Sequence, residues 1–333
     1  MAKEKVSGEK LTLQETITKM NKEYGKNSIM SSVEYIDPKN IISSGSILLN
    51  RALGVGGYVR GRVVEIMGWS SGGKSTTTLH AIAESQKKGL RCALIDGEGS
   101  FDRKYAESIG VIVNEEDPNH LIVSQPGYGE AAYDIANALI STGEVHVVII
   151  DSQTSLLPKK AMEGNGGEYA LGLHARMMSL EIPKLMNNAL KNNALVIIIS
   201  QYREKIGVMF GNPTTTNGGH ALPFYSHVRL EVSRNTIDKA EEINNIKVKV
   251  VKNKLAIPFK EAEIEILWGV GFNKTKEIID LAIEYNIIEK SGNTYSYKET
   301  KLGVGEKQLN AFIEANDGLL EEIKPLVLEQ LNK

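Results

Sequence analysis

Apolar residues along this chain fall into short continuous runs separated by longer segments of helical pattern. The runs occupy residues 63–67, 90–95, 145–150 and 194–199. Continuous apolar runs of this length are typical of parallel strands that are buried on both faces. The segments between them, such as 128–141, have helical patterns. This alternation predicts an α/β fold with a mostly parallel central sheet.

The N-terminal segment, residues 1–35, has a pattern of its own. A stripe of helical spacing contains Leu13, Ile17, Met20 and Tyr24. Thr12 and Glu15 have the spacing of a capping box, which predicts the start of a helix. A short helix with one apolar stripe packs either on its own domain or on a neighbouring subunit, and the pattern alone favours neither.

The C-terminal third departs from the pattern of parallel strands. Residues 228–232, 246–251 and 263–267 alternate between apolar and polar positions, as antiparallel strands that extend a sheet do. From about residue 269 the pattern changes to short helices and a hairpin around Gly292. We therefore expect three parts: an N-terminal segment at 1–35, a core at 36–268 and a small α+β domain at 269–333.

The composition is that of an ordinary globular protein, and it limits the cellular compartments in which the protein is expected. Of the 333 residues, 41% are hydrophobic and 24% are charged, and no apolar run approaches the length of a membrane span. The N-terminus lacks the apolar stretch of a secretion signal, and the one cysteine, Cys92, lies in an apolar strand. These features predict a cytoplasmic protein with no membrane partner. A net charge of −2 means that any nucleic-acid site must be a local basic surface.

The run at 63–67 leads into a glycine-rich loop. The loop reads Gly68, Trp69, Ser70, Ser71, Gly72, Gly73, Lys74 and Ser75, and Thr76 follows at the start of a predicted helix. This pattern, G-x-x-x-x-G-K-[ST] between a strand and a helix, is typical of a phosphate-binding loop. Backbone N–H groups would bind a polyphosphate, Lys74 would neutralise it, and the Ser75 hydroxyl would hold Mg²⁺. A chance glycine-rich turn is the alternative.

Acidic residues follow two other predicted strands. Glu98 comes after strand 90–95, and Asp151 ends strand 145–150. Because the carboxyl ends of parallel strands meet at one edge of a sheet, we expect both acids near the phosphate loop. Glu98 could activate an attacking water, and Asp151 has the place of a Walker B acid that reaches Mg²⁺ through its water shell. A solvated loop acid is the alternative for Glu98.

Two long connections carry glycine and basic residues. One spans 159–167 and leads into a helix with Arg176, and the other spans 202–217. Connections of this length inside a compact domain are more often functional than idle. The second mixes basic residues, which bind phosphates, with apolar residues that insert between bases. A surface loop without a function is the alternative.

In their order along the chain, these motifs resemble those of the bacterial and phage RecA recombinase family over nearly the full length. The matching segments are 68–75, 95–98, 124–126, 149–152, 175–179, 205–213 and 250–254. The resemblance implies a RecA-type P-loop ATPase core with an N-terminal polymerisation helix and a small α+β C-terminal domain. It also implies a filament, dependent on ATP and Mg²⁺, that coats single-stranded DNA, pairs it with homologous duplex DNA and exchanges strands.

The resemblance implies roles for residues at the nucleotide. Positions that bind ATP in the family match Gly68 to Thr76, Asp102, Tyr105 and Asp151, with Mg²⁺ at Ser75 and Asp151 and adenine at Asp102 and Tyr105. Glu98 matches the base that activates water, and Gln201 matches the residue that senses the γ-phosphate and relays its presence to the loop that follows. Lys252 and Lys254 match cations that reach the ATP of a neighbouring subunit, as an arginine finger does.

The resemblance also implies a DNA surface and a subunit junction. DNA-binding positions of the family match Arg176, Arg203 and Lys205 on phosphates, Met209 and Phe210 near bases, and the loop residues Gly207, Val208, Gly218 and Gly219. Two DNA-binding loops match 158–171 and 202–217. Phe224 matches an apolar contact between subunits. The resemblance further implies that the N-terminal helix packs on the next protomer. A single-strand-binding protein is an expected partner.

The chain departs from the family pattern at several places. Trp69 and Ser70 stand where the family usually has Pro and Glu, so the usual signal from this loop to DNA is not expected. Thr275 stands where an aromatic residue often contacts the nucleotide from the adjoining subunit, which leaves base stacking to Tyr105. Pro183 is expected to kink its helix or begin a new turn. The acidic tail of the family is absent, which predicts weaker inhibition of duplex binding.

Two other functions share many of these features. A ring helicase of the wider RecA-like class would have the same phosphate loop and Walker B strand, but it would work as a closed hexamer. A nucleotide-gated filament that coats DNA without exchanging strands is the second alternative.

Overall fold

The computed structural model describes residues 11–24, 29, 36–163, 168–204, 214–238 and 242–331. The chain divides into two compact units, Met1–Asn40 and Ile41–Lys333. In the first unit, helix α1 (Leu13–Tyr24) begins at a capping box, because Thr12 N donates to Glu15 Oε2 over 2.8 Å and Glu15 N donates to Thr12 Oγ1 over 3.3 Å. A 3-10 turn, η1 (Pro38–Asn40), ends this unit. The predicted N-terminal helix is confirmed.

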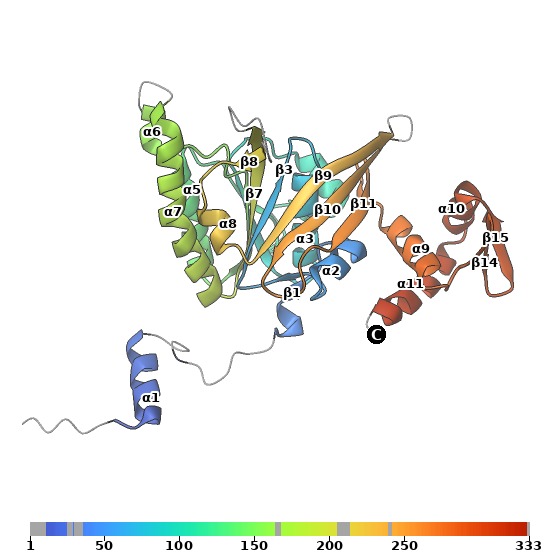
Figure 1. Cartoon of the computed structure of the whole chain (residues 1–333), viewed down its shortest axis with the longest axis horizontal. Helices are drawn as coiled ribbons and strands as arrows, with labels where there is room; N and C mark the ends of the chain where they lie inside the picture. The colour runs from blue at the N-terminus through green and yellow to red at the C-terminus, as the bar shows by residue number, and fades with distance from the viewer. Residues whose placement is uncertain are drawn as a thin grey trace, which may run out of the picture. The chain divides into compact units, whose positions relative to one another are not determined.

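A central sheet organises the second unit (Figure 1). Among the described residues it has ten strands in the order β12-β11-β10-β9-β3-β7-β6-β4-β5, with β8 paired to β7. Their bounds are β3 (Val63–Gly68), β4 (Arg91–Asp96), β5 (Ile122–Ser124), β6 (Val145–Asp151), β7 (Leu195–Glu204), β8 (Thr214–Thr216), β9 (Val228–Asp238), β10 (Ile243–Asn253), β11 (Glu261–Leu267) and β12 (Gly271–Phe272). The strands from β9 to β5 run parallel, while β10, β11 and β12 are antiparallel. The mostly parallel sheet is confirmed, although β9 is antiparallel only to β10 and lies parallel to β3.

Helices cover both faces of the sheet. The bounds are α2 (Ile47–Leu53), α3 (Lys74–Gln86) and α4 (Arg103–Ile109) on one face, and α5 (Gly129–Ser141) and α7 (Glu168–Lys191) on the other (Figure 1). Strand side chains alternate between the faces: in β4, Cys92 and Leu94 join the first core, and Ala93 and Ile95 join the second. Cys92 is fully buried, and burial raises the pKa of its thiol to about 12, so it is a core residue, as predicted.

A small α/β subdomain follows the sheet. It consists of α9 (Lys274–Glu284), the antiparallel strands β13 (Glu289–Ser291), β14 (Thr294–Tyr297) and β15 (Thr300–Val304), α10 (Glu306–Glu314) and α11 (Asp317–Leu331). Ile47 and Leu48 of α2 pack against its core, and Ile47 N donates to Glu277 Oε2 over 2.7 Å. The predicted fold class is therefore confirmed. The domain boundaries at 35/36 and 268/269 stay predictions.

Shorter elements connect these parts. They are the paired strands β1 (Ile41–Ile42) and β2 (Tyr58–Val59), and the helices α6 (Lys159–Glu163) and α8 (Ala221–Tyr225). Helix α7 continues through Pro183, so this residue does not begin a separate helix. In the described part of the chain, every helix is too short or too polar to cross a membrane.

Candidate nucleotide and DNA site

The phosphate loop leaves β3 at Gly68 and enters α3 at Lys74. A Cβ at Gly68 would lie 2.1 Å from the Val232 carbonyl oxygen of β9, so only glycine fits where the loop leaves the sheet. Gly73, just before α3, has a φ of +93°, in the left-handed region that favours glycine. The first N–H groups of α3 have no partner within their helix and are available to an anion.

Lys74 lies inside the loop. Its side chain is almost buried, and its Nζ donates to the Trp69 carbonyl oxygen over 2.6 Å. Burial lowers the pKa of the ammonium group, while Asp151 and Glu98 oppose that shift. Among the described residues, the ammonium donates to one loop carbonyl, from which a phosphate can draw it.

Ser75 and Asp151 meet across the sheet edge, as the sequence predicts. Ser75 Oγ donates to Asp151 Oδ2 over 2.7 Å. Burial raises the pKa of Asp151 to about 6, and the neighbouring Glu98 adds to the rise. A divalent cation beside this carboxylate would favour its charged form. A hydroxyl and a carboxylate are the hard oxygen donors that suit Mg²⁺, which keeps further places for water and phosphate.

Glu98 is held at the same edge by two donors. Ser152 Oγ donates to Glu98 Oε1 over 2.6 Å, and Gln201 Nε2 donates to the same oxygen over 2.5 Å. Gln201 is itself fixed, because its backbone N–H donates to Thr154 Oγ1 over 3.0 Å. Glu98 is exposed at the rim of the site, within reach of water. The predicted base and the predicted sensor are therefore in direct contact.

Asp96 is a site residue whose role the sequence did not reveal. It is buried, and it accepts hydrogen bonds from the backbone N–H groups of Glu98, Ser100 and Phe101 and from Gln125 Nε2. These bonds shape the turn that presents Glu98. The signal in the sequence is an acid followed by Gly-Glu-Gly-Ser, a combination typical of a turn closed by a carboxylate.

A cavity of about 280 Å³ opens beside the phosphate loop. Its lining includes the loop, Tyr105, Asn244 and Trp268. Tyr105 is tied to the start of α3 by a hydrogen bond of 2.9 Å between its hydroxyl and Thr76 Oγ1. Asn244 Oδ1 is buried and has no hydrogen-bond partner among the described residues. Trp268 supplies a second aromatic wall that the sequence analysis missed.

Two further residues of the sequence prediction lie outside the lining of this cavity, and their contacts with a nucleotide stay predictions. Asp102 does not line the cavity but caps α4, where its Oδ1 accepts Tyr105 N–H over 3.1 Å. It therefore positions Tyr105. Thr275 lies in α9 and does not line the cavity of its own chain, and its predicted place at the nucleotide of an adjoining subunit stays a prediction.

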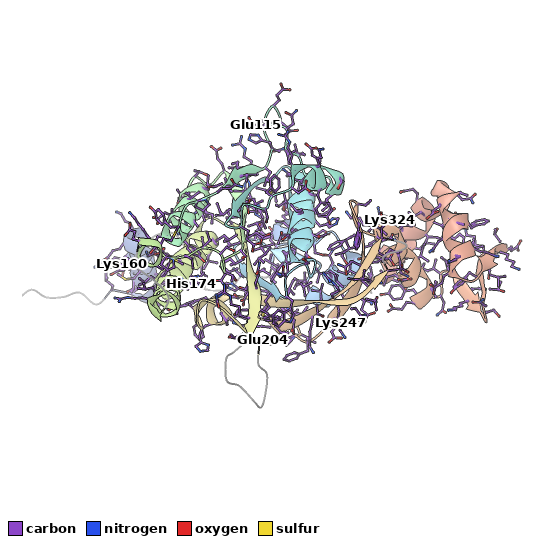
Figure 2. All side chains as sticks on the ribbon, turned by 90° about the horizontal axis from the view of Figure 1, so that it is seen from above. Glu115, Lys160, His174, Glu204, Lys247 and Lys324 are labelled. Carbon is purple, nitrogen blue, oxygen red and sulfur yellow. The ribbon has the colours of Figure 1, made fainter. Side chains whose placement is uncertain are left out.

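The candidate DNA surface is described in part. Lys205, Gly207, Val208, Met209 and Phe210 lie outside the described residues. Arg176 on α7 and Arg203 on β7 are exposed. A Cβ at Gly219 would lie 3.1 Å from Ala175 Cβ, and one at Gly218 would lie 3.0 Å from Met178 Cγ, so both glycines lie against α7. Figure 2 labels His174 on α7 and Glu204 at the end of β7, the two elements that carry the arginines.

Phe224, Lys252 and Lys254 form a distal surface away from the phosphate loop. Lys252 Nζ donates to two carbonyl oxygens of α8 over 2.7 and 2.8 Å, and Phe224 is 70% exposed. Lys254 N donates to the His227 carbonyl, and His227 N donates to the carbonyl of Val63, the first residue of β3. The phosphate loop follows the other end of β3, about 16 Å away at the usual rise per residue. The distal surface therefore does not join its own nucleotide cavity.

A phosphate loop between β3 and α3, with a Walker B acid at the end of β6, defines a P-loop ATPase. Its mostly parallel sheet is extended by antiparallel strands and followed by a small subdomain. The chain belongs to the RecA family: residues 11–273 match the RecA N-terminal domain, and residues 276–332 match the RecA C-terminal domain.

Relatives named Protein RecA extend over nearly the full chain. The one from Bacteroides thetaiotaomicron is 48% identical over 335 residues, which cover 98% of this chain and 99% of that protein. The one from Francisella tularensis subsp. novicida is 46% identical over 336 residues, covering 99% of this chain and 90% of that protein. The chain is a recombinase of this family and a DNA-dependent ATPase, and a ring helicase is not favoured.

Proposed function

We propose that ATP binds between the phosphate loop of one protomer and the distal surface of the next. We also propose that this subunit interface controls the affinity for single-stranded DNA. The contact of Gln201 Nε2 with Glu98 Oε1 carries the proposal. It connects the candidate base to the strand that continues into Arg203. The nucleotide and DNA sites thus share one strand, β7.

The first step is capture of the triphosphate. The free N–H groups at the start of α3 bind the phosphate oxygens, and Lys74 exchanges its bond to the Trp69 carbonyl for one to phosphate. The base enters the cavity between Tyr105 and Trp268. There Asn244 Oδ1, which has no hydrogen-bond partner among the described residues, can accept from the amino group of adenine.

Ser75 and Asp151 would hold Mg²⁺. The ion would neutralise charge on the phosphate oxygens during transfer. The raised pKa of Asp151 makes this site dependent on pH, because the carboxyl must lose its proton for the cation to be favoured.

Glu98 orients and deprotonates the attacking water. Ser152 and Gln201 hold its carboxylate in place, so the oxygen that receives the proton is already positioned. A γ-phosphate offers Gln201 a competing acceptor. When Gln201 changes partner, the strand that leads to Arg203 can shift with it, which links the nucleotide state to DNA binding.

The distal surface supplies the second half of the site. Lys252 and Lys254 carry charge that their own phosphate loop cannot use, and Phe224 presents an exposed ring. Placed against the phosphate loop of another copy, the two ammonium groups would stabilise the transferred phosphate in trans. A head-to-tail contact of this type does not close on itself and generates a helical filament. Helix α1, with its apolar stripe, would cover a neighbouring protomer.

The exposed Arg176 and Arg203 bind DNA phosphates, and Gly218 and Gly219, which lie against α7, contribute backbone to the same surface. Binding should weaken steeply with salt, because each neutralised phosphate releases a counterion. The filament then pairs its strand with homologous duplex DNA. A single-strand-binding protein would clear competing structure from the strand, and the cytoplasm would be the place of action.

Electron microscopy tests the proposal. Protein, single-stranded DNA, Mg²⁺ and a slowly hydrolysed ATP analogue should give open helical filaments, and Lys74→Ala should give none under the same conditions. Closed rings would contradict the filament. A strand-exchange assay, with and without hydrolysable ATP, then separates a recombinase from a coat protein, since a coat would show filaments without exchanged strands.

A further inference from the structure

An aromatic contact joins the phosphate loop to strand β7. The rings of Trp69 and Tyr202 lie edge to face, with centroids 5.9 Å apart and an interplanar angle of 69°. The neighbouring strands β3 and β7 are paired up to Gly68 and Gln201, so each ring belongs to the residue just beyond that last pair (Figure 1). Edge-to-face pairs at this distance attract each other beyond the area that they bury.

Each partner of the contact is tied to a different function. On the loop side, the Trp69 carbonyl accepts a hydrogen bond from Lys74 Nζ over 2.6 Å. A displacement of this ammonium group therefore acts directly on the tryptophan backbone. On the strand side, Tyr202 precedes Arg203, which pairs with Thr215 at the candidate DNA surface. The contact thus lies between the cation that binds nucleotide and the cation that binds DNA.

Tyr202 is held firmly enough to transmit a displacement. Its hydroxyl donates to Glu231 Oε1 over 3.0 Å, and burial together with that carboxylate raises its pKa, so the hydroxyl stays a donor. The phosphate loop is tied to the same strand, β9, because the Arg234 guanidinium donates to the Ser71 carbonyl. The Tyr202 ring is therefore fixed to β9, and a shift of the Trp69 side chain acts on a ring that is held in place.

We propose that the Trp69–Tyr202 contact is a positioning contact that couples the phosphate loop to Arg203, separately from the contact of Gln201 with Glu98. A polyphosphate draws Lys74 away from the Trp69 carbonyl and releases the loop backbone, and the two rings pass that change to β7. The coupling rests on the proposed function. It supplies a connection from loop to DNA at the position where the usual family residues are replaced by Trp69 and Ser70.

The two connections differ in what they detect. Gln201 competes for the γ-phosphate, which only a triphosphate carries, whereas Lys74 also contacts the β-phosphate. The aromatic contact should therefore respond to diphosphate and triphosphate alike. The contact with Glu98 should respond to triphosphate only.

A double-mutant cycle tests the coupling. Trp69→Leu, Tyr202→Leu and the double variant are compared by the ratio of single-stranded DNA affinities with and without the ATP analogue. Each single variant should change this ratio by about threefold to tenfold, as expected for the loss of one aromatic pair, and the double variant should change it no further. Tyr202→Phe separates the ring from its anchor, because it keeps the ring edge and loses the bond to Glu231, so it should change the ratio less than Tyr202→Leu does.

Fluorescence gives a second readout. The chain has two tryptophans, so a Trp268→Phe background leaves Trp69 as the reporter. Because Trp268 lines the nucleotide cavity, the nucleotide affinity of this background is measured first and saturating concentrations are used. ADP and the ATP analogue should both change its emission, and Tyr202→Leu should remove most of that change. Thermal unfolding of each variant checks that the fold is kept.

The outcomes separate the coupling from the proposed function. If the unchanged chain binds DNA without regard to nucleotide, the proposed function fails and the coupling fails with it. If the unchanged chain depends on nucleotide but the leucine variants keep the full ratio, only the coupling is overturned. Additive effects of the two substitutions would also overturn it, because independent effects need no contact between the rings.

Discussion

The phosphate-loop edge and the distal surface of this molecule differ in how their polar groups are satisfied. At the loop edge, Ser75, Asp151, Glu98 and Gln201 bond to one another inside one protomer. At the distal surface, Phe224 projects into solvent, and Lys252 is bound only by α8 carbonyls among the contacts described. The loop edge is satisfied within one protomer, whereas the distal surface leaves an aromatic ring exposed, which fits the proposed contact with a second copy of the chain.

The largest expected effect is a loss of DNA-stimulated ATPase when the phosphate loop or the distal surface loses its cations. The two sets of substitutions are made in separate preparations of the protein. Lys74→Ala removes the cation of the loop, and the pair Lys252→Ala and Lys254→Ala removes the cations of the distal surface. Each preparation alone should lose DNA-stimulated ATPase by about 10³-fold, as when a cation is lost from phosphoryl transfer. In a mixture, the intact loop of the distal variant can meet the intact distal surface of Lys74→Ala, so part of the activity should return.

ATPase measured across mixing ratios checks this. Lys249→Ala is the control for the distal variant, because that exposed cation lies on the same strand but pairs with Glu261. Its activity should stay near that of the unchanged chain. If mixtures recover nothing at any ratio, the two surfaces do not meet in one site.

The next effect isolates chemistry from binding at the loop edge. Glu98→Gln keeps an oxygen for Ser152 and Gln201 but removes the base, so turnover should fall by about 10²- to 10⁴-fold while nucleotide and DNA affinities hold. Steady-state ATPase and DNA binding with ATP measure the two quantities. Glu115→Gln, an exposed acid in Figure 2, should leave both unchanged. Undiminished turnover in Glu98→Gln would remove this residue from the reaction.

A smaller effect is expected at the ring of the distal surface. Phe224→Ala should raise the protein concentration needed for filament assembly by about tenfold to a hundredfold, the range for burying one aromatic side chain. The thermal midpoint of unassembled protein should not change, because the side chain is 70% exposed. Light scattering and calorimetry give the two values. Leu328→Ala is the control, because it also removes an exposed apolar side chain. An equal assembly defect in this variant would show that Phe224 is not a specific contact between subunits.

The smallest effect should stay within one protomer. Burial raises the pKa of Glu277 to about 7 from 4.5, so this residue lowers the stability of the fold as pH rises from about 4.5 to 7. Glu277→Gln should therefore be more stable than the unchanged chain at pH 8, by about 1–3 kcal/mol, with the difference vanishing near pH 4. Urea unfolding at several pH values measures this. An assembly defect in Glu277→Gln would mean that its effect is not confined to the protomer.

Local patterns predicted much of this molecule. The capping box at Thr12, the loop from Gly68 to Ser75 and the apolar strands each depend on a few adjacent residues, and the structure has them in place. The meeting of Asp151 with Ser75 followed from the rule that parallel strands share a carboxyl edge.

Features that depend on the order of strands could not be predicted. Glu65 lies within an apolar run, yet it is fully buried and pairs with Arg229 over 2.6 Å, because β9 happens to lie beside β3. Asn244 and Trp268 reach the cavity from β10 and from just beyond β11, which only the antiparallel extension of the sheet brings there. The placement of Asp102 as a helix cap and not as a cavity wall likewise required the backbone.

His80 gives the helix behind the phosphate loop a fixed attachment. Its ring stacks on Phe272 at 4.0 Å, and its Nε2 accepts the Phe272 backbone N–H over 2.8 Å. Burial lowers the pKa of His80 to about 3, so the imidazole stays neutral and the bond persists across the whole physiological range of pH. A Cβ at Gly271 would lie 2.5 Å from that same nitrogen. His80 therefore joins α3 directly to β12, the last strand before α9 and the C-terminal subdomain.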